Sequence, residues 1–136
     1  MPVGFSDELK KVYDSFRNAR EVKAVTYGDE QIKLIENGID GVDDVIFGDD
    51  KTAVRSMLFA LERYLDPYYN CPLPYRERMY DSLHRLLTTT DDDDIIDDVL
   101  DLMMYEDNDI FLRENIDRIK PERQADVRDR FSWAFE

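Results

Sequence analysis

Apolar residues recur at helical spacing along nearly the whole chain. Between residues 51 and 65, Val54, Met57, Leu58 and Leu61 form one stripe, and Pro67 follows where a helix must end. The same period appears within 79–87, 95–104, 111–119 and 127–135. Tight turns separate these segments, and no long alternating run favours a strand. The pattern predicts an all-α fold of about six or seven helices, arranged as one irregular bundle or short stack over residues 1–136.

The remaining segments have weaker patterns. Ser6 is expected to cap a first helix, and a second helical piece is expected to end at Gly38. Residues 21–27 alternate, and we interpret them as helix or loop, with a short strand as the alternative. We expect residues 40–50 to form a loop with one apolar plug. Residues 68–75 (YYNCPLPY) are expected to form the one long non-helical loop.

Two of the expected helices share a short internal echo. Residues 57–65 (MLFALERYL) and 79–87 (MYDSLHRLL) carry Met, Leu, Arg and Leu at matching places, 22 residues apart. The segment 94–103 (DIIDDVLDLM) then follows a short turn, like the second helix of a hairpin. Over residues 51–120 this resembles the helix pairs of HEAT-type repeats, and the resemblance implies a short stack of such pairs. The residues that carry it in the second helix are Asp94, Ile95, Val99, Leu100 and Leu102.

Charge changes this picture most. The formal net charge is −14, and 43% of the residues are hydrophobic, which is too apolar for a disordered acidic chain. Residues 88–110 carry ten acids and no base, and residues 29–50 carry eight acids and only Lys33. We call these segments the second and the first acidic island. Because affinity for nucleic acid depends on Lys and Arg at phosphates, direct nucleic-acid binding is disfavoured.

The second island predicts an acidic ridge on the helix that follows Thr90 or Asp91. Its apolar residues face inward, so its aspartates fall on the opposite face, and no Lys or Arg lies at compensating spacing on that helix. Such repulsion is expected to be relieved by a positively charged partner. The predicted partner-binding acids are Asp94, Asp97, Asp98 and Asp101 of the ridge, with Asp43 and Asp44 of the first island.

Exposed aromatic residues are further candidates for partner contacts. Tyr68 and Tyr69 lie in a tyrosine-rich, proline-rich loop, and tyrosine is common at interface hot spots. The alternative is that these rings pack over the turn between two helices. Phe131 and Phe135 are expected to dock on one helical face, which leaves Trp133 pointing elsewhere as an anchor candidate.

No motif for catalysis, a metal or a cofactor stands out. Zinc needs several His or Cys ligands, whereas the chain has one His and one Cys, and the acidic runs lack the glycine and closing glutamate of a calcium loop. The one histidine, His84, lies beside the apolar stripe of residues 79–87, and we expect it to be a boundary residue of the core. No glycine-rich phosphate loop is found. We therefore expect a protein that is not an enzyme and binds no cofactor. Without a secretory signal, a membrane-length apolar run or a possible internal disulfide, a cytoplasmic location is expected.

Small size, helical pattern and acidic islands together resemble the small acidic helical immunity proteins encoded beside bacterial toxins. The resemblance implies a protein-binding module that neutralises a basic toxin such as a nuclease. Two other classes stay open. One is a nucleic-acid mimic of the anti-restriction type, in which carboxylates replace phosphates, and the other is a small helical adaptor or scaffold.

Overall fold

The computed structural model describes residues 25–136, and within them it is all-α: seven α-helices, three single-turn 3-10 helices and no strand. The all-α prediction is confirmed. The helix expected from Ser6 and residues 21–24 lie outside the described residues, and residues 25–28 are not helical. The α-helices are α2 (Asp29–Asn37), α3 (Ile39–Ile46), α4 (Lys51–Leu65), α5 (Arg76–Thr89), α6 (Asp93–Met103), α7 (Asp109–Asn115) and α8 (Pro121–Arg130). The 3-10 helices are η1 (Pro67–Tyr69), η2 (Ile116–Arg118) and η3 (Ser132–Phe135).

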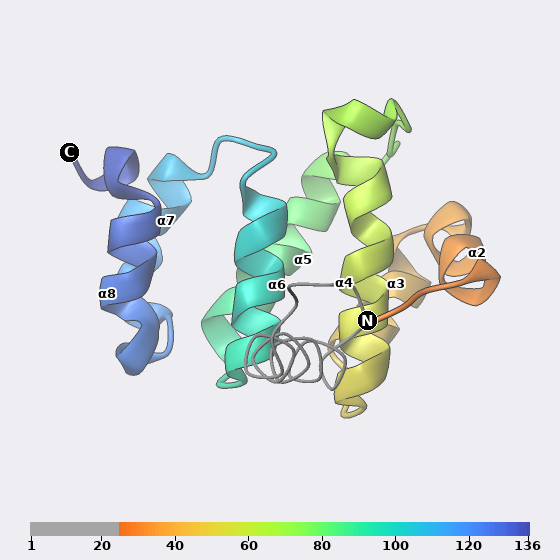
Figure 1. Ribbon diagram of the computed structural model, residues 1–136, viewed down its shortest axis with the longest axis horizontal. Helices are drawn as coiled ribbons and strands as arrows, with labels where there is room; N and C mark the ends of the chain where they lie inside the picture. Colours follow the sequence, from red (N-terminus) through yellow and green to blue (C-terminus); the bar gives the residue numbers. More distant parts are fainter. Residues whose placement is uncertain (1–24) are drawn as a thin grey trace, which may run out of the picture.

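The helices form two layers. α4, α6 and α8 stand side by side in the front layer, and α3, α5 and α7 lie behind them (Figure 1). Contacts agree with this view, because α4 packs on α6 in one layer and α3 packs on α5 in the other, while α3–α4 and α5–α6 join the layers. The described residues thus form an all-α bundle in two layers, and the 22-residue echo joins α4 and α5, which lie in different layers.

The front helices run in the same direction. Three side-chain hydrogen bonds join α4 to α6 or to the residues after it, and each spans 43 residues: Lys51–Asp94, Arg55–Asp98 and Tyr105–Glu62. A constant offset in which both numbers rise together means that α4 and α6 are parallel. Helices that are equivalent members of successive helix pairs are related in this way.

The core lies between the layers. Met57 and Leu61 of α4, Met79 and Leu83 of α5, and Leu100 of α6 are fully buried. Burying each such side chain stabilises the fold by about 1.5–3 kcal/mol before the entropy of ordering is counted. The apolar stripes predicted from the sequence thus form the faces by which the helices pack.

Several expected boundaries are corrected. The loop expected over residues 40–50 is confined to residues 47–50, because α3 occupies Ile39–Ile46 and buries Val42 and Ile46. The apolar residues of α3 repeat at i, i+3 and i+7 from Ile39, but the aspartates between them suggested a loop. The cap of α6 is Asp92 rather than Thr90 or Asp91, since the Asp92 side chain accepts the N–H groups of Asp94 and Ile95.

The C-terminal segment is also more broken than expected. α8 ends at Arg130, and η3 carries the last aromatics. Phe131 is buried and Phe135 packs partly against the core, as expected, although the helix does not continue between them.

Candidate protein-binding surface

The predicted acidic ridge is the outer face of α6. Ile96, Val99 and Leu100 are buried, so the aspartates between them point to the surface of the front layer. The Asp92 cap fixes where the helix begins and thereby which residues face outward. The ridge is flanked on one side by α4 and on the other by α8 (Figure 1).

Cations from α4 meet one edge of the ridge. The Lys51 ammonium lies 2.8 Å from Asp94 and 3.1 Å from the capping carboxylate of Asp92. One turn further on, Arg55 donates two hydrogen bonds to Asp98, at 2.8 and 3.2 Å. This fork is the strong geometry for an arginine–carboxylate pair, and both of its side chains are largely buried.

Cations from α8 and the turn before it meet the other edge. Lys120 donates to Asp93 at 3.2 Å. Arg123 contacts Asp93, Asp97 and Asp126, and these hydrogen bonds, that to Asp97 first, raise the pKa of its guanidinium. Arg130 donates to Asp101 at 2.6 Å. The order of these pairs shows that α8 runs parallel to α6.

The interpretation that the ridge lacks compensating charge is therefore wrong. Asp94, Asp97, Asp98 and Asp101 each contact a cation on a neighbouring helix. Within one helix, only bases three or four residues away lie beside an acid, and α6 has none there. The bases that pair with these acids are 26 to 43 residues away in the chain, so helical spacing does not reveal them. The ridge first of all joins the three front helices, and its contact with a partner stays a prediction.

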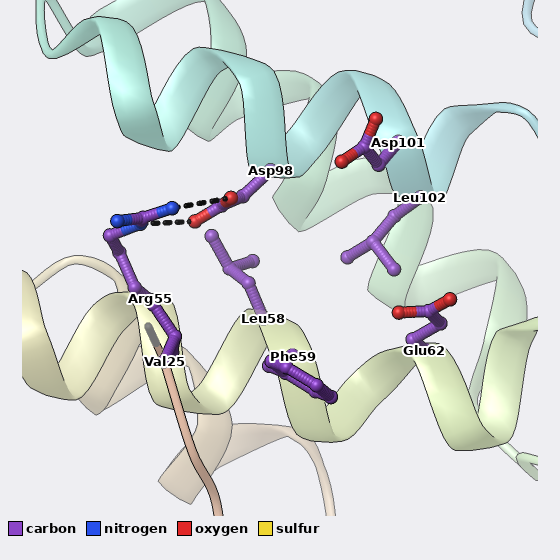
Figure 2. Close-up of a pocket in the computed structure, with 8 residues that line it drawn as sticks. All are labelled: Val25, Arg55, Leu58, Phe59, Glu62, Asp98, Asp101 and Leu102. Carbon is purple, nitrogen blue, oxygen red and sulfur yellow. Dashed lines mark hydrogen bonds and ion pairs between the residues drawn. The ribbon is translucent and has the colours of Figure 1, made fainter. Parts of the chain in front are cut away.

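A groove of about 250 Å³ separates α4 from α6 beside the Arg55–Asp98 pair. Figure 2 shows Phe59 and Glu62 of α4 facing Asp101 and Leu102 of α6 across it. Burial raises the pKa of Asp98, and the contact with Arg55 opposes that rise. Phe59, 47% exposed, gives the groove an apolar wall.

The first acidic island has a different environment. Glu36, Asp40 and Asp44 are exposed on α2 and α3, and none of them forms an ion pair with another described residue. Asp43 is the partial exception, because its Oδ2 lies 4.0 Å from Arg85, while its buried Oδ1 accepts no hydrogen bond from the described residues. Within residues 25–136, the exposed acids Glu36, Asp40 and Asp44 of this island are therefore not neutralised by an ion pair.

The structure places the two islands in different layers. α3 lies behind α4, whereas α6 lies beside α4 (Figure 1). The predicted residues Asp43 and Asp44 are therefore not brought together with those of α6. In contrast to the α6 acids, Glu36, Asp40 and Asp44 form no ion pair with another residue of the described range.

The tyrosine cluster divides into packed and exposed members. Tyr75 donates to the carbonyl of Ile35 and Tyr80 to that of Leu102, and burial raises the pKa of each to about 12. Tyr68 and Tyr69 are 85% and 52% exposed on η1, with their rings edge to face. The packing alternative holds for the first two residues, and the two that were predicted to meet a partner are accessible.

Trp133 lies at the far end of the front layer from this loop. Its side chain is 49% exposed, and its indole N–H donates to Asp109 at 3.0 Å. It lines a second cavity, of about 200 Å³, at the end of α6. The expectation that Trp133 points away from Phe131 is wrong, because the two rings lie 5.5 Å apart, but its side chain is accessible to a partner.

His84 is a boundary residue of the core, as its position beside the α5 stripe predicts. Its ring stacks on Phe111 with centroids 3.8 Å apart, and Nε2 lies 2.6 Å from Asn108 Oδ1. Among residues 25–136, no three His, Cys, Asp or Glu side chains form a group that could hold a metal ion. In the same range no helix is long and apolar enough to cross a membrane.

Comparison of the chain with protein-family models, with curated proteins and with solved structures finds no match. The functional argument therefore rests on the chain's own residues.

Proposed function

We propose that this protein is a non-enzymatic acidic binding module that neutralises a basic partner, most simply a toxin such as a nuclease. One observation carries the proposal: the exposed acids Glu36, Asp40 and Asp44 of α2 and α3 form no ion pair with a described residue. Uncompensated charge of one sign steers a partner of opposite sign and speeds its association. A positively charged substrate groove is such a partner.

The structure changes which acids are assigned to this role. Reversing the α6 acids would break ion pairs inside the protein. Loss of binding by such a variant could then result from unfolding rather than from the loss of a partner contact. Glu36, Asp40 and Asp44 form no such ion pair with residues 25–136, and we assign the main partner contact to them. The front-layer groove and the exposed tyrosines of η1 are additional surfaces for the same partner.

The experiment is capture from native extract at low and high salt. Three baits are compared: the unaltered protein, a Glu36→Lys/Asp40→Lys/Asp44→Lys variant, and a matched Glu114→Lys/Asp117→Lys/Glu122→Lys variant. The matched variant changes the net charge equally at exposed acids of α7, η2 and α8 that form no ion pair with described residues.

The proposal expects one basic protein that salt releases, captured by the first and third baits and lost with the second. The released protein should also lose its enzymatic activity when the unaltered chain is added back. Capture that survives the α2–α3 reversal contradicts the assignment. A set of unrelated DNA-binding proteins would instead indicate a nucleic-acid mimic, and a non-basic partner indifferent to salt would indicate an adaptor.

A further inference from the structure

The cavity beside Trp133 is open to solvent, and its lining is half apolar, from Met103, Met104, Phe131 and Trp133, and half polar. It lies where α6 ends, and residues 104–109 and η3 close around it. Met104 and Trp133 are each 49% exposed, while Phe131 at its base is buried. Exposed apolar side chains that border one concave site are typical of an interaction surface, unlike scattered single ones.

Trp133 is held in place rather than free. Its indole N–H donates to Asp109, and its ring lies 5.5 Å from that of Phe131 at a tilted angle. A tryptophan already fixed in this way loses little conformational freedom when a partner covers it. Tryptophan is also among the residues that contribute most to binding at interfaces.

The rim of the cavity is acidic. Glu106, Asp107 and Asp109 line it. Only Glu106 has an ion pair, with Arg76 at 2.8 Å, whereas Asp107 and Asp109 have none with the described residues. An apolar centre with an acidic rim complements a segment in which an apolar side chain is flanked by Lys or Arg.

We propose that this cavity binds an apolar side chain of a basic protein segment, with the flanking cations of that segment meeting Asp107 and Asp109. The inference deepens the proposed function, on which it rests for the basic nature of the partner. In this arrangement the α2–α3 acids attract the partner at long range, and the Trp133 cavity supplies contact and selectivity.

Trp133 is the single tryptophan of the chain, so its fluorescence reports on this cavity alone. The probes are two peptides of equal charge and length, one alternating arginine and leucine, the other alternating arginine and serine. The first should shift the emission to shorter wavelength and bind about tenfold more tightly, because burying one leucine side chain removes its apolar surface from water. Equal affinity for the two peptides would overturn the proposal.

Variants test the two parts of the site by calorimetry. Trp133→Ala and Met104→Ser should each remove the preference for the leucine peptide, with folding checked by circular dichroism. Asp107→Lys should weaken its binding more than Asp129→Lys, an equal change of charge at an exposed acid of α8. If Asp107→Lys and Asp129→Lys weaken peptide binding equally, the effect depends on net charge alone and the proposed site is wrong.

These experiments distinguish failure of the cavity proposal from failure of the proposed neutralising function. Reversal of Glu36, Asp40 and Asp44 should leave the leucine preference of the peptides unchanged, because these acids lie on α2 and α3. If extract capture shows no basic partner while the preference persists, the neutralising function fails and the cavity stands. If capture succeeds and Trp133→Ala leaves both the preference and the capture unaltered, the cavity fails and the function stands.

Discussion

At the scale of single residues, the contact between His84 and Asn108 determines which nitrogen of the neutral histidine carries the proton. The Asn108 amide nitrogen donates to the carbonyls of Met103 and Glu106, so its oxygen is the atom that accepts from His84. The histidine proton therefore lies on Nε2 in the neutral ring. This contact joins α5 to the turn between α6 and α7.

Burial lowers the pKa of His84 below its ordinary value of 6.5, against the opposing hydrogen bond to Asn108. The unfolded chain then binds a proton that the folded protein resists. We expect the free energy of unfolding to fall between pH 7.0 and pH 5.5. His84→Gln should flatten this dependence, as measured by urea unfolding at the two pH values.

Asp98 acts in the opposite sense, because its raised pKa makes its contribution fall as pH rises. Comparing the unaltered chain with His84→Gln cancels that contribution. An undiminished pH dependence in the variant would mean that His84 is not the group responsible. The sequence predicted a boundary histidine from its place beside the α5 stripe, but Phe111 and Asn108 lie too far along the chain for any local pattern to reveal them.

At the scale of the element, α6 depends on its N-terminus. The Asp92 carboxylate accepts two backbone N–H groups and also meets Lys51 of α4. Desolvation raises the pKa of Asp92, but the hydrogen bonds from Ile95 and Lys51 outweigh it and the net change is downward. The stability that Asp92 provides is thus present above its unfolded pKa, near 4, and is lost as pH falls through the folded value.

Asp92→Ala should lower the free energy of unfolding at pH 7 by about 1–2 kcal/mol, which is the usual cost of removing a cap. Asp91→Ala is the matched control, because Asp91 is exposed and forms no hydrogen bond with a described residue. It should change stability by less than about 0.5 kcal/mol. Urea unfolding measures both, and equal effects would contradict the placement of the cap.

The elements also show how far local patterns reach. Apolar periodicity predicted α4, α5 and α6, because each packs by one continuous stripe, whereas the stripes predicted within 111–119 and 127–135 run past α7 and α8 into η2 and η3. It failed at α3, where Asp40, Asp43 and Asp44 suggested a loop although Ile39, Val42 and Ile46 are buried on one face. The aspartate-rich composition of this segment favoured a loop, whereas the spacing of its apolar residues indicated the helix that is observed.

At the scale of the whole molecule, the two acidic islands have different roles. The second island joins parallel helices of the front layer through pairs such as Arg55–Asp98 and Arg130–Asp101. In the first island, Glu36, Asp40 and Asp44 form no ion pair with any residue that the structure describes. The sequence predicted both sets of acids as candidates but could not tell them apart, because the pairing bases come from other helices. The pairs between α4 and α6 share an offset of 43 residues. That offset can be used to predict the pairs only when the two helices are known to be parallel.

The most direct test compares urea unfolding of two reversals that change net charge equally: Glu36→Lys/Asp40→Lys/Asp44→Lys and Asp97→Lys/Asp98→Lys/Asp101→Lys. In the first, lysine near the ends of α2 and α3 favours the helix dipole and offsets the cost at Asp40, so stability should stay within about 0.5 kcal/mol. In the second, the lost Arg55, Arg123 and Arg130 contacts should cost about 3 kcal/mol or more. Equal losses in the two variants, or a larger loss in the first, would contradict the division into an internal and an external acidic surface.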